Sequence, residues 1–376
     1  MQTEESIRLS IGGKIYKTWD GWSVESDLLT PADGFELELF TRDTVQLPEA
    51  LVEGASCTLT LGRDRVLTGQ LDELEHDVSK RGIFIRVTGR DKAAALVDCS
   101  APFVSMREAS LAQILKEVVT PLGITRVEVR AAGKPIQRRV QVEPGQSGWE
   151  ALLQVAEANG LWPWVEPDGL LVVGGPDYTS APVGELIMRT DGKGNNVERL
   201  SVRRSIAGRY SQVTVLGQHG QYDNDGLDTG GKTHMRSIIK DDVLARRGIF
   251  RPKIVIDSAS ESQDMATTRA RKVLADSRLE GFEVRAVVKG FRAPNGAVWK
   301  PGQRVIVRSE PHGLDATFFI MARTLRLTRG QGGAYTELRL REDKMWVLDG
   351  NPLKKHKGKK SKTDADAAFI NMVRGL

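Results

Sequence analysis

The sequence predicts a mainly β protein of the α+β class. It would consist of two similar small β-barrel or sandwich units, an inserted α+β module and a basic C-terminal tail. Alternating apolar segments run through residues 33–91 and return at 280–343, whereas helix-capping patterns with helical apolar spacing occur between them, at 100–180. The expected parts are 1–97 for the first β unit, 98–188 for the inserted module, 189–345 for the second β unit and 346–376 for the tail.

The first β unit is indicated by short alternating segments. Residues 35–40 and 57–61 alternate apolar and polar side chains, as half-buried strands do. Residues 67–74 and 83–87 continue the pattern, and turn-forming residues separate all four segments. Several short strands at close spacing are typical of a small sandwich or barrel.

The inserted module combines two helices with a hairpin. Ser105 and Glu108 have the spacing of a capping box, and they precede an apolar helical face. That face consists of Leu111, Ile114, Leu115, Val118 and Val119. Ser147 and Glu150 repeat the capping pattern before a second helix. Residues 161–173 then predict a hairpin, in which Pro163 favours an edge strand because proline cannot donate to a neighbour.

The second half of the chain returns to β structure with one interruption. Residues 211–216 predict a strand, and residues 217–233 a polar loop. Residues 261–279 suit a helix, after which strands continue to about residue 340. The inward face of that helix is expected to consist of Met265, Ala266, Ala270, Val273 and Leu274.

An internal duplication relates the two β units. Gly34-Phe35-Glu36 corresponds to Gly281-Phe282-Glu283, and in both copies a glycine turn about 20 positions later leads into an alternating strand. A strand pair follows in each copy, ending at Asp91 and at Asp343. The second copy is longer, and we expect its extra residues in one turn at 311–314. The alternative is that two unrelated β segments share common turn chemistry.

Composition narrows the class of protein. The chain has 376 residues, 40% of them hydrophobic and 27% charged, with a net charge of +5. This composition is typical of a soluble protein, and the charge is too modest to indicate nucleic-acid binding by itself. No signal peptide or membrane span is predicted. Cys57 and Cys99 have no motif spacing, so we expect two buried or idle thiols, with a disulfide as the unsupported alternative.

Together, the first β unit, the module and the returning unit resemble the baseplate hub proteins of phage Mu-like contractile tails. The residues that carry this resemblance are Ser147–Glu150, Leu161–Trp164, Asp168–Val173 and the Pro301-Gly302-Gln-x-Val segment. A more distant resemblance is to the N-terminal part of type VI secretion spike proteins. The resemblance covers nearly the whole chain and rests on the order and spacing of segments.

The resemblance implies a structural protein of the virion tail, made in the host cytoplasm before assembly. It implies a homotrimeric ring in which paired β units give pseudo-sixfold symmetry. The partners would be other copies of the chain, the tail spike protein, and the tail tube or other baseplate proteins. DNA would pass through the bore, and no direct membrane insertion is expected. No catalytic residue and no cofactor is implied.

One motif supports a competing hypothesis of nucleotide binding. Gly226, Gly231, Lys232 and Thr233 satisfy the GxxxxGK[ST] pattern of a P-loop. A P-loop follows directly on a buried strand, however, whereas the long polar stretch 217–225 separates this motif from the predicted strand. No alternation of strands and helices surrounds it. We therefore interpret it as a surface loop.

Other chemistry has weaker support. The five histidines form no metal pair, and Asp223, Asp225 and Asp228 lack the spacing of a calcium loop. A tail-associated cell-wall hydrolase would need two poised carboxylates, and the sequence singles out no such pair. We therefore predict no enzyme and no metal site.

The C-terminal tail is predicted to contact a partner. Its basic run is too charged and too poor in apolar residues to fold alone. The candidate contact residues are Lys354, Lys355, Lys357, Lys359 and Lys360.

Overall fold

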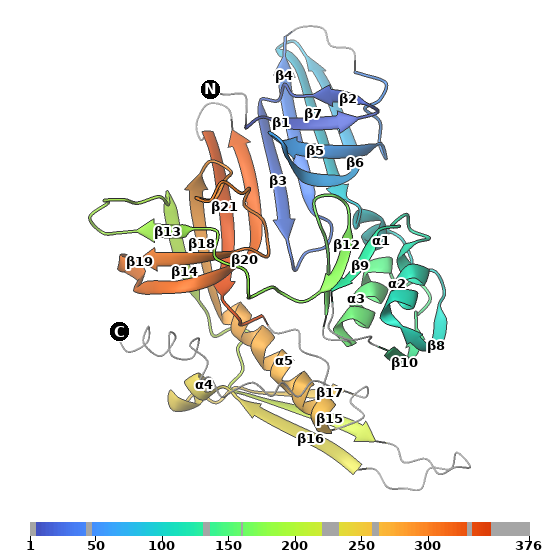
Figure 1. The fold of residues 1–376 in the computed structure, drawn as a ribbon, viewed down its shortest axis with the longest axis vertical. Helices are drawn as coiled ribbons and strands as arrows, with labels where there is room; N and C mark the ends of the chain where they lie inside the picture. Colours follow the sequence, from blue (N-terminus) through green and yellow to red (C-terminus); the bar gives the residue numbers. More distant parts are fainter. Residues whose placement is uncertain are drawn as a thin grey trace. The chain divides into compact units, whose positions relative to one another are not determined.

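The computed structural model describes residues 5–42, 47–130, 136–158, 161–219, 233–257, 263–328 and 333–346. The chain forms two compact units (Figure 1). The first unit contains Met1–Ala156, Trp162–Leu200 and Arg285–Leu340. The second unit contains Glu157–Leu161, Ser201–Val284 and Arg341–Leu376. Mainly β structure with few helices confirms the predicted fold class in its broad form.

A 13-stranded sheet is the main feature of the described structure, and its first half follows the order β3-β4-β7-β6-β5-β1-β2. Apolar residues alternate inward along these strands, including Leu9, Leu37, Leu59 and Val87, all fully buried. The strands are β1 (Ile7–Ile11), β2 (Lys14–Tyr16), β3 (Gly21–Asp27), β4 (Gly34–Thr41), β5 (Ser56–Leu61), β6 (Asp64–Ser79) and β7 (Gly82–Asp91).

The other half of this sheet follows the order β14-β18-β21-β20, with β19 pairing β20 and β13 pairing β19. These strands are β13 (Glu185–Met188), β14 (Arg199–Arg204), β18 (Phe282–Lys289), β19 (Arg304–Ser309), β20 (Leu314–Thr328) and β21 (Gly333–Glu342). Phe318, Phe319, Leu325 and Leu340 lie in its core.

The same strand order occurs twice. The run β3-β4-β7-β6-β5-β1 in the first half corresponds to β14-β18-β21-β20-β19-β13 in the second. The match includes the four strands of each predicted copy and one flanking strand on each side. It is incomplete at one edge, where β13 runs parallel to β19 but β1 runs antiparallel to β5.

The two copies differ in length at the turn that follows β5 in the first copy and β19 in the second. The turn between β5 and β6 spans residues 62–63, whereas the matching connection between β19 and β20 spans 310–313. That longer turn contains the short helix η1 (Glu310–His312). The connection between β20 and β21, residues 329–332, lies outside the described residues. The longer turn at 310–313 agrees with the predicted position of the extra residues, 311–314.

The two halves join through one hydrogen-bonded strand pair. Strand β20 runs antiparallel to β3, with register from Ala322 opposite Asp27 to Leu327 opposite Trp22. Sequence analysis predicted two β units and did not predict that they share one sheet. Strand alternation identifies which residues of a strand face inward, but it does not identify the partner strand.

The inserted module contains two helices and two small sheets, and the short helix α1 (Ala94–Asp98) precedes it. Its elements are β8 (Ser105–Ser110), α2 (Leu111–Val119), β9 (Val127–Arg130), β10 (Ile136–Gln141), α3 (Gly148–Ala158), β11 (Trp162–Val165) and β12 (Leu171–Gly174). Helix α2 buries all five predicted apolar residues, from Leu111 to Val119.

The capping prediction for α2 was wrong by five residues. Ser105 begins strand β8, which pairs antiparallel with β10. The cap is Ser110, whose hydroxyl accepts from the Gln113 N–H while the Gln113 side chain accepts from the Ser110 N–H. Both serines satisfy the capping pattern, and the pairing of β8 with β10 selects the later one.

The other predictions for the module were confirmed. The Ser147 N–H donates to Glu150 Oε2 (2.9 Å), and the Glu150 N–H donates to Ser147 Oγ (3.1 Å). Strands β11 and β12 form the predicted antiparallel hairpin. The three-stranded order β11-β12-β9 places Pro163 on an edge strand, as expected for a residue without an N–H.

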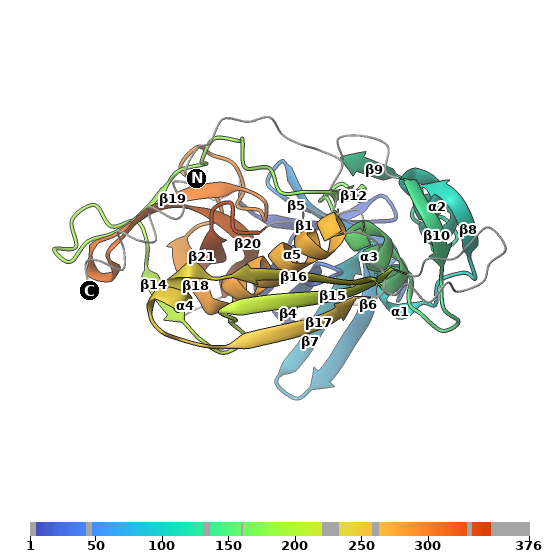
Figure 2. The same cartoon turned by 90° about the horizontal axis from the view of Figure 1, so that it is seen from below.

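The second unit has its own sheet, ordered β16-β15-β17, and a long helix, α5 (Gln263–Gly281), that packs on one face. Its strands are β15 (Gln212–His219), β16 (Thr233–Lys240) and β17 (Pro252–Asp257), and a short helix α4 (Asp242–Arg246) follows β16. Val213 and Val215 pack against Ala266, Ala270 and Leu274 of α5. This confirms the predicted helix and its inward face at those three positions and at Val273, which is partly buried against the same cluster. The side chain of Met265 lies outside the described residues. Figure 2 shows the same elements from below.

Gly69 offers a test of how closely the strands of the first half pack. It lies opposite Asp91, and a Cβ there would lie 2.7 Å from the Arg90 carbonyl carbon and from Asp91 Cα. We expect Gly69→Ala to lower the free energy of unfolding by about 1–3 kcal/mol, because backbone atoms cannot yield as a side chain can. Gly175→Ala is the control, since nothing lies within 4 Å of its Cβ position. Chemical denaturation in which the two variants behave alike would contradict this account.

Candidate functional site

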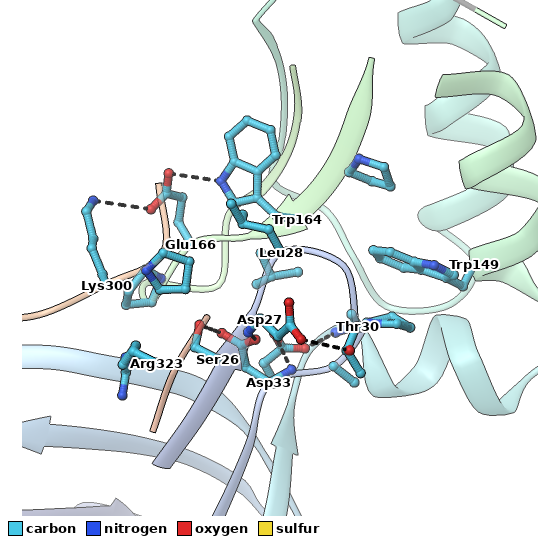
Figure 3. Close-up of a pocket in the computed structure, with 18 residues that line it drawn as sticks. Ser26, Asp27, Leu28, Thr30, Asp33, Trp149, Trp164, Glu166, Lys300 and Arg323 are labelled. Carbon is cyan, nitrogen blue, oxygen red and sulfur yellow. Dashed lines mark hydrogen bonds and ion pairs between the residues drawn. The ribbon is translucent and has the colours of Figure 1, made fainter. Parts of the chain in front are cut away.

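A pocket lies in the first unit beside the β3–β20 pair (Figure 3). It has a cavity volume of about 50 Å³. Its lining comes from the end of β3 with the following loop, the end of β7, the start of helix α3, the hairpin of the inserted module, and strand β20 with the loop before β19. Representative lining residues are Asp33, Asp91, Trp164, Glu166, Lys300 and Arg323.

Two aspartates hold the loop after β3 against the end of β7. The Asp33 N–H donates to Asp91 Oδ2 (3.2 Å), and the Asp91 N–H donates to the Asp33 carbonyl (2.8 Å). The other carboxylate oxygen of Asp91 accepts from the Ala93 N–H (2.7 Å). Asp33 accepts from the Ser26 hydroxyl and from the Asp27 N–H (3.1 Å). Each carboxyl therefore closes a backbone turn.

Burial changes the acidity of both aspartates. Removal from water raises the pKa of Asp33 to about 6, although hydrogen bonds from Ser26 and the charge of Arg323 oppose the rise. Burial also raises the pKa of Asp91 to about 8, and repulsion from Asp33 adds to it. Because they interact, the two carboxyls titrate as a pair.

Arg323 is the cation beside this pair. Its side chain lies in β20, opposite Ser26 of β3, and the residue is 3% exposed. The guanidinium donates to the Val24 carbonyl (3.2 Å) and, at 3.5 Å, to the Val66 carbonyl. Burial lowers the pKa of Arg323 to about 10, so the group stays protonated at neutral pH. The guanidinium group of Arg323, which belongs to the second β unit, is thus enclosed by backbone of the first β unit.

The rim of the pocket connects the inserted module to the second half of the sheet. Trp164 Nε1 donates to Glu166 Oε1 (3.2 Å), and the other oxygen of Glu166 lies 3.9 Å from Lys300 Nζ. The Trp162 indole donates to the Leu28 carbonyl of the loop after β3. The Thr68 hydroxyl donates to the Pro167 carbonyl (2.8 Å). These contacts hold the hairpin against the β strands.

The site is suited to holding chain segments together. Its cavity of about 50 Å³ is small beside the few hundred Å³ or more that ligand pockets usually offer. Asp33 and Asp91 are a carboxylate pair of the kind that a hydrolase requires, but both bind backbone N–H groups. Structural networks also perturb pKa values, so the shifts alone do not indicate catalysis.

A second buried charge cluster lies in the second unit. Asp241 is 0% exposed, and its Oδ2 lies 3.0 Å from Arg209 Nη2 and 3.2 Å from Arg278 Nε. Its Oδ1 accepts from the Val243 and Leu244 N–H groups at the start of α4. Burial favours a higher pKa for Asp241, but the charges of Arg278 and Arg209 outweigh it and hold the pKa below its usual value.

The structure around Thr233 does not support the nucleotide-binding hypothesis. Gly226, Gly231 and Lys232 lie outside the described residues. Thr233 begins strand β16, which pairs antiparallel with β15. A P-loop is followed by a helix whose N-terminus faces the phosphates, whereas a strand follows this motif. Strand β15 also extends to His219, so residues 217–219, which were predicted to begin the polar loop, belong to a strand.

The remaining predicted residues have separate outcomes. Cys57 and Cys99 are free, as expected, and burial raises the pKa of the Cys57 thiol to about 12. Within the described residues, no group of three or more His, Cys, Asp or Glu side chains could hold a metal ion. No helix among them is long and apolar enough to cross a membrane. The predicted tail contacts, Lys354 to Lys360, and the loop aspartates 223, 225 and 228 lie outside the described residues.

Sequence reasoning missed the buried charges. A capping pattern was present for Asp241, which directly precedes α4. For Asp33, Asp91 and Arg323 there was little local signal, because charged side chains are usually exposed to water. Their partners come from segments up to 299 positions apart, as in the bond from Arg323 to Val24.

Comparisons with known proteins place the chain in one class, the phage tail proteins. Four family models match consecutive segments. Residues 6–91 match the N-terminal domain of Mu phage GpP-like baseplate assembly proteins, and 93–175 match the second domain of gp44-like baseplate hub proteins. Residues 209–274 match the third domain of NMB1110-like tail proteins, and 276–345 match a tail protein C-terminal domain.

Full-length relatives define the family. The chain is 34% identical to a tail protein of Neisseria meningitidis of known structure, with a TM-score of 0.80, covering 92% of this chain and 98% of that one. A 43 kDa tail protein from prophage MuSo2 of Shewanella oneidensis is 28% identical, with a TM-score of 0.77 and coverage of 91% and 99%. The baseplate hub protein gp44 of Escherichia phage Mu is 25% identical over 346 residues, 89% of this chain and 87% of that protein.

The chain belongs to the same family of tail proteins as the Neisseria meningitidis protein. It is similar to the gp44-like baseplate hub proteins of phage Mu, which confirms the resemblance seen in the sequence. The fold also occurs in a protein of type VI secretion. A type VI secretion component of E. coli shares it with a TM-score of 0.53 at 13% identity, covering 90% of this chain and 78% of that one. The distant similarity to type VI spike proteins is therefore confirmed at the level of fold.

Proposed function

We propose that this chain is the structural hub of a contractile-tail baseplate and acts as a homotrimer. Three copies form a ring with pseudo-sixfold symmetry, which joins the sixfold tail tube to the threefold central spike. DNA passes through the bore of the ring. The protein belongs to the virion tail, and its partners are the spike and the tube or other baseplate proteins.

The repeated strand order carries this proposal. Each chain contains the run β3-β4-β7-β6-β5-β1 and its counterpart β14-β18-β21-β20-β19-β13. We infer that the two β units arose by duplication, with residues 98–188 as an insertion and 346–376 as a separate tail. Two similar units per chain allow three chains to present six similar surfaces to a sixfold partner. The β3–β20 pair and Arg323 connect the two halves of the large sheet, each of which contains one copy of the β unit.

The oligomeric state provides the first test. Light scattering should give three times the chain mass of 41.4 kDa, either for the protein alone or after addition of its spike protein. The spike protein is added because hub and spike share the threefold axis in this proposal, so the spike provides a surface on which the three chains meet. A mass of one chain under both conditions would exclude the trimer.

The basic run of the tail is proposed to bind a neighbouring tail protein through Lys354, Lys355, Lys357, Lys359 and Lys360. Deletion of residues 351–376 should leave the trimer intact and reduce the yield of assembled baseplate. Negative-stain counting of assembled particles measures this yield. An unchanged yield would remove the tail from the list of partner contacts.

The competing nucleotide hypothesis also has a direct test. Because a strand follows Lys232, we expect millimolar Mg-ATP to leave the melting temperature unchanged. Lys232→Ala should behave as the parent protein does. A stabilisation by Mg-ATP that Lys232→Ala removes would restore the P-loop interpretation.

A further inference from the structure

One face of the sheet in the second unit lacks a cover among the described residues. Helix α5 packs against the side that carries Val213, Val215 and Ile239. Side chains alternate along a strand, so the residues between these positions point to the opposite face. The pairing register puts Ile238, Thr214 and Ile254 in one row of that face, and Arg236, Leu216 and Ile256 in the next.

Three isoleucines on this opposite face are exposed. The exposed fractions are 40% for Ile238, 63% for Ile254 and 79% for Ile256. Single exposed apolar residues are ordinary, but three isoleucines in two adjacent rows form a patch that water solvates poorly. Two of them lie on β17, which is an edge strand of the β16-β15-β17 sheet. Such a face is expected to bind an apolar partner.

The end of this chain has a matching apolar pattern. Phe369, Met372, Val373 and Leu376 have spacings of three, four and seven, which place them on one face of a helix. Thr363 and Asp366 precede them with the spacing of a capping box. The segment 363–376 is thus distinct from the lysine-rich run before it, and its pattern is that of an amphipathic helix.

The connecting chain is long enough to bring the two together. Arg341 Nη1 donates to the Phe282 carbonyl (2.7 Å), and Arg341 Nη2 lies 2.9 Å from Glu283 Oε2. These contacts place the chain next to the C-terminal end of α5, which ends at Gly281. Helix α5 has 19 residues, so it is about 28 Å long at 1.5 Å per residue. The 16 residues 347–362 can span about 50 Å when extended.

Charge favours the same pairing. Arg236 and Lys240 are exposed and occupy rows of the uncovered face, opposite Leu216 and Gln212. The segment carries Asp364 and Asp366 at its beginning, where acidic residues also stabilise a helix N-terminus. Acidic side chains at one end and apolar side chains along one side therefore match the basic and apolar parts of the face.

We propose that residues 363–376 dock on the uncovered face of the β16-β15-β17 sheet of the same chain. The apolar side of the segment covers Ile238, Ile254 and Ile256. Docking turns the lysine-rich run into a loop anchored at both ends, which would hold its positive charges at a fixed place for a partner. This inference concerns the second unit alone and does not depend on a trimeric ring.

Hydrogen exchange of the full chain tests the proposal. Peptides covering 363–376 should exchange at least tenfold more slowly than expected for a free peptide. The double variant Ile254→Ser and Ile256→Ser should remove this protection, while peptides from β18 keep theirs because both side chains point to solvent. Deletion of 363–376 should in turn speed exchange in β17 by a similar factor. Ile15→Ser is the matched control, since Ile15 is 57% exposed in the first unit and should leave 363–376 unchanged.

Three results would overturn the proposal. In the first, residues 363–376 exchange as a free peptide in the full chain. In the second, they are protected but indifferent to the two serine substitutions, which would place their docking surface elsewhere. In the third, protection disappears on dilution, which would make another copy of the chain the occupant of this face.

Discussion

Replacing Asp241 by alanine is expected to destabilise the second unit by about 3–5 kcal/mol. The Asp241 carboxylate is fully buried and lies within 3.2 Å of two arginines, Arg209 and Arg278. Its removal leaves two cations without their shared counter-ion and leaves the Val243 and Leu244 N–H groups uncapped. Most of the cost comes from the two guanidinium groups, because each loses the carboxylate that compensates part of its lost hydration.

Native-state hydrogen exchange of β15 amides measures this loss within the second unit. Asp242→Ala is the matched control, because Asp242 is the exposed neighbour and contributes through the helix dipole alone, about 0.3–1 kcal/mol. Asp241→Asn should fall between the two, since the amide oxygen can still cap α4. A loss below 1 kcal/mol for Asp241→Ala would show that the arginines find other partners.

The first unit is expected to lose stability as the pH rises from about 4 to about 8. Asp33 and Asp91 have pKa values raised to about 6 and about 8 in the folded chain, above the usual value of 3.8. The folded state therefore binds more protons than the unfolded state in this range. Their contribution is complete below the unfolded pKa and is lost as the pH passes through the folded values. One proton corresponds to at most about 1.4 kcal/mol per pH unit.

The substitution Asp33→Asn should flatten this dependence. The asparagine can accept from the Asp27 N–H and donate to the Ser26 hydroxyl, so both contacts persist. Its neutral side chain removes the repulsion that helps to raise the pKa of Asp91. Denaturant titrations at pH 5 and pH 8 give the comparison. Asp98→Asn is the control, because its pKa is lowered by Arg90 and it stays ionised across this range. If the free energy of unfolding changed equally with pH in the parent and in Asp33→Asn, the raised pKa values would not belong to Asp33 and Asp91.

The repeated unit could be predicted from sequence because its signals are local. Glycine turns, alternating strands and their order along the chain identified both copies, and the two copies have the same strand order. The joining of β20 to β3 could not be predicted in this way. Each of these strands has an apolar face, and nothing local specifies which edge meets which. The helix start at Ser110 shows the same limit, since Ser105 has an equally good capping pattern and tertiary pairing decided against it.

The candidate site was less predictable than the fold. Asp33 follows an ordinary turn, and Arg323 is one of 54 Lys and Arg residues in the chain. They become informative only once β3 and β20 are paired, because that pairing buries the guanidinium. In contrast, the P-loop pattern was specific in sequence and lacks the helix that a phosphate site requires after it. Local pattern thus predicted elements well and sites poorly.

The central claim is that two copies of one β unit per chain let three chains match a sixfold partner. Electron-microscopic averaging of the assembled ring, viewed along its axis and without imposed symmetry, tests it most directly. The account predicts six similar lobes in the β layer related by an approximate 60° rotation, together with exact threefold symmetry for the inserted modules. The departures from sixfold symmetry should be largest at the turns 62–63 and 310–313. A ring of six chains, or a trimer whose β layer has only three lobes, would contradict the account.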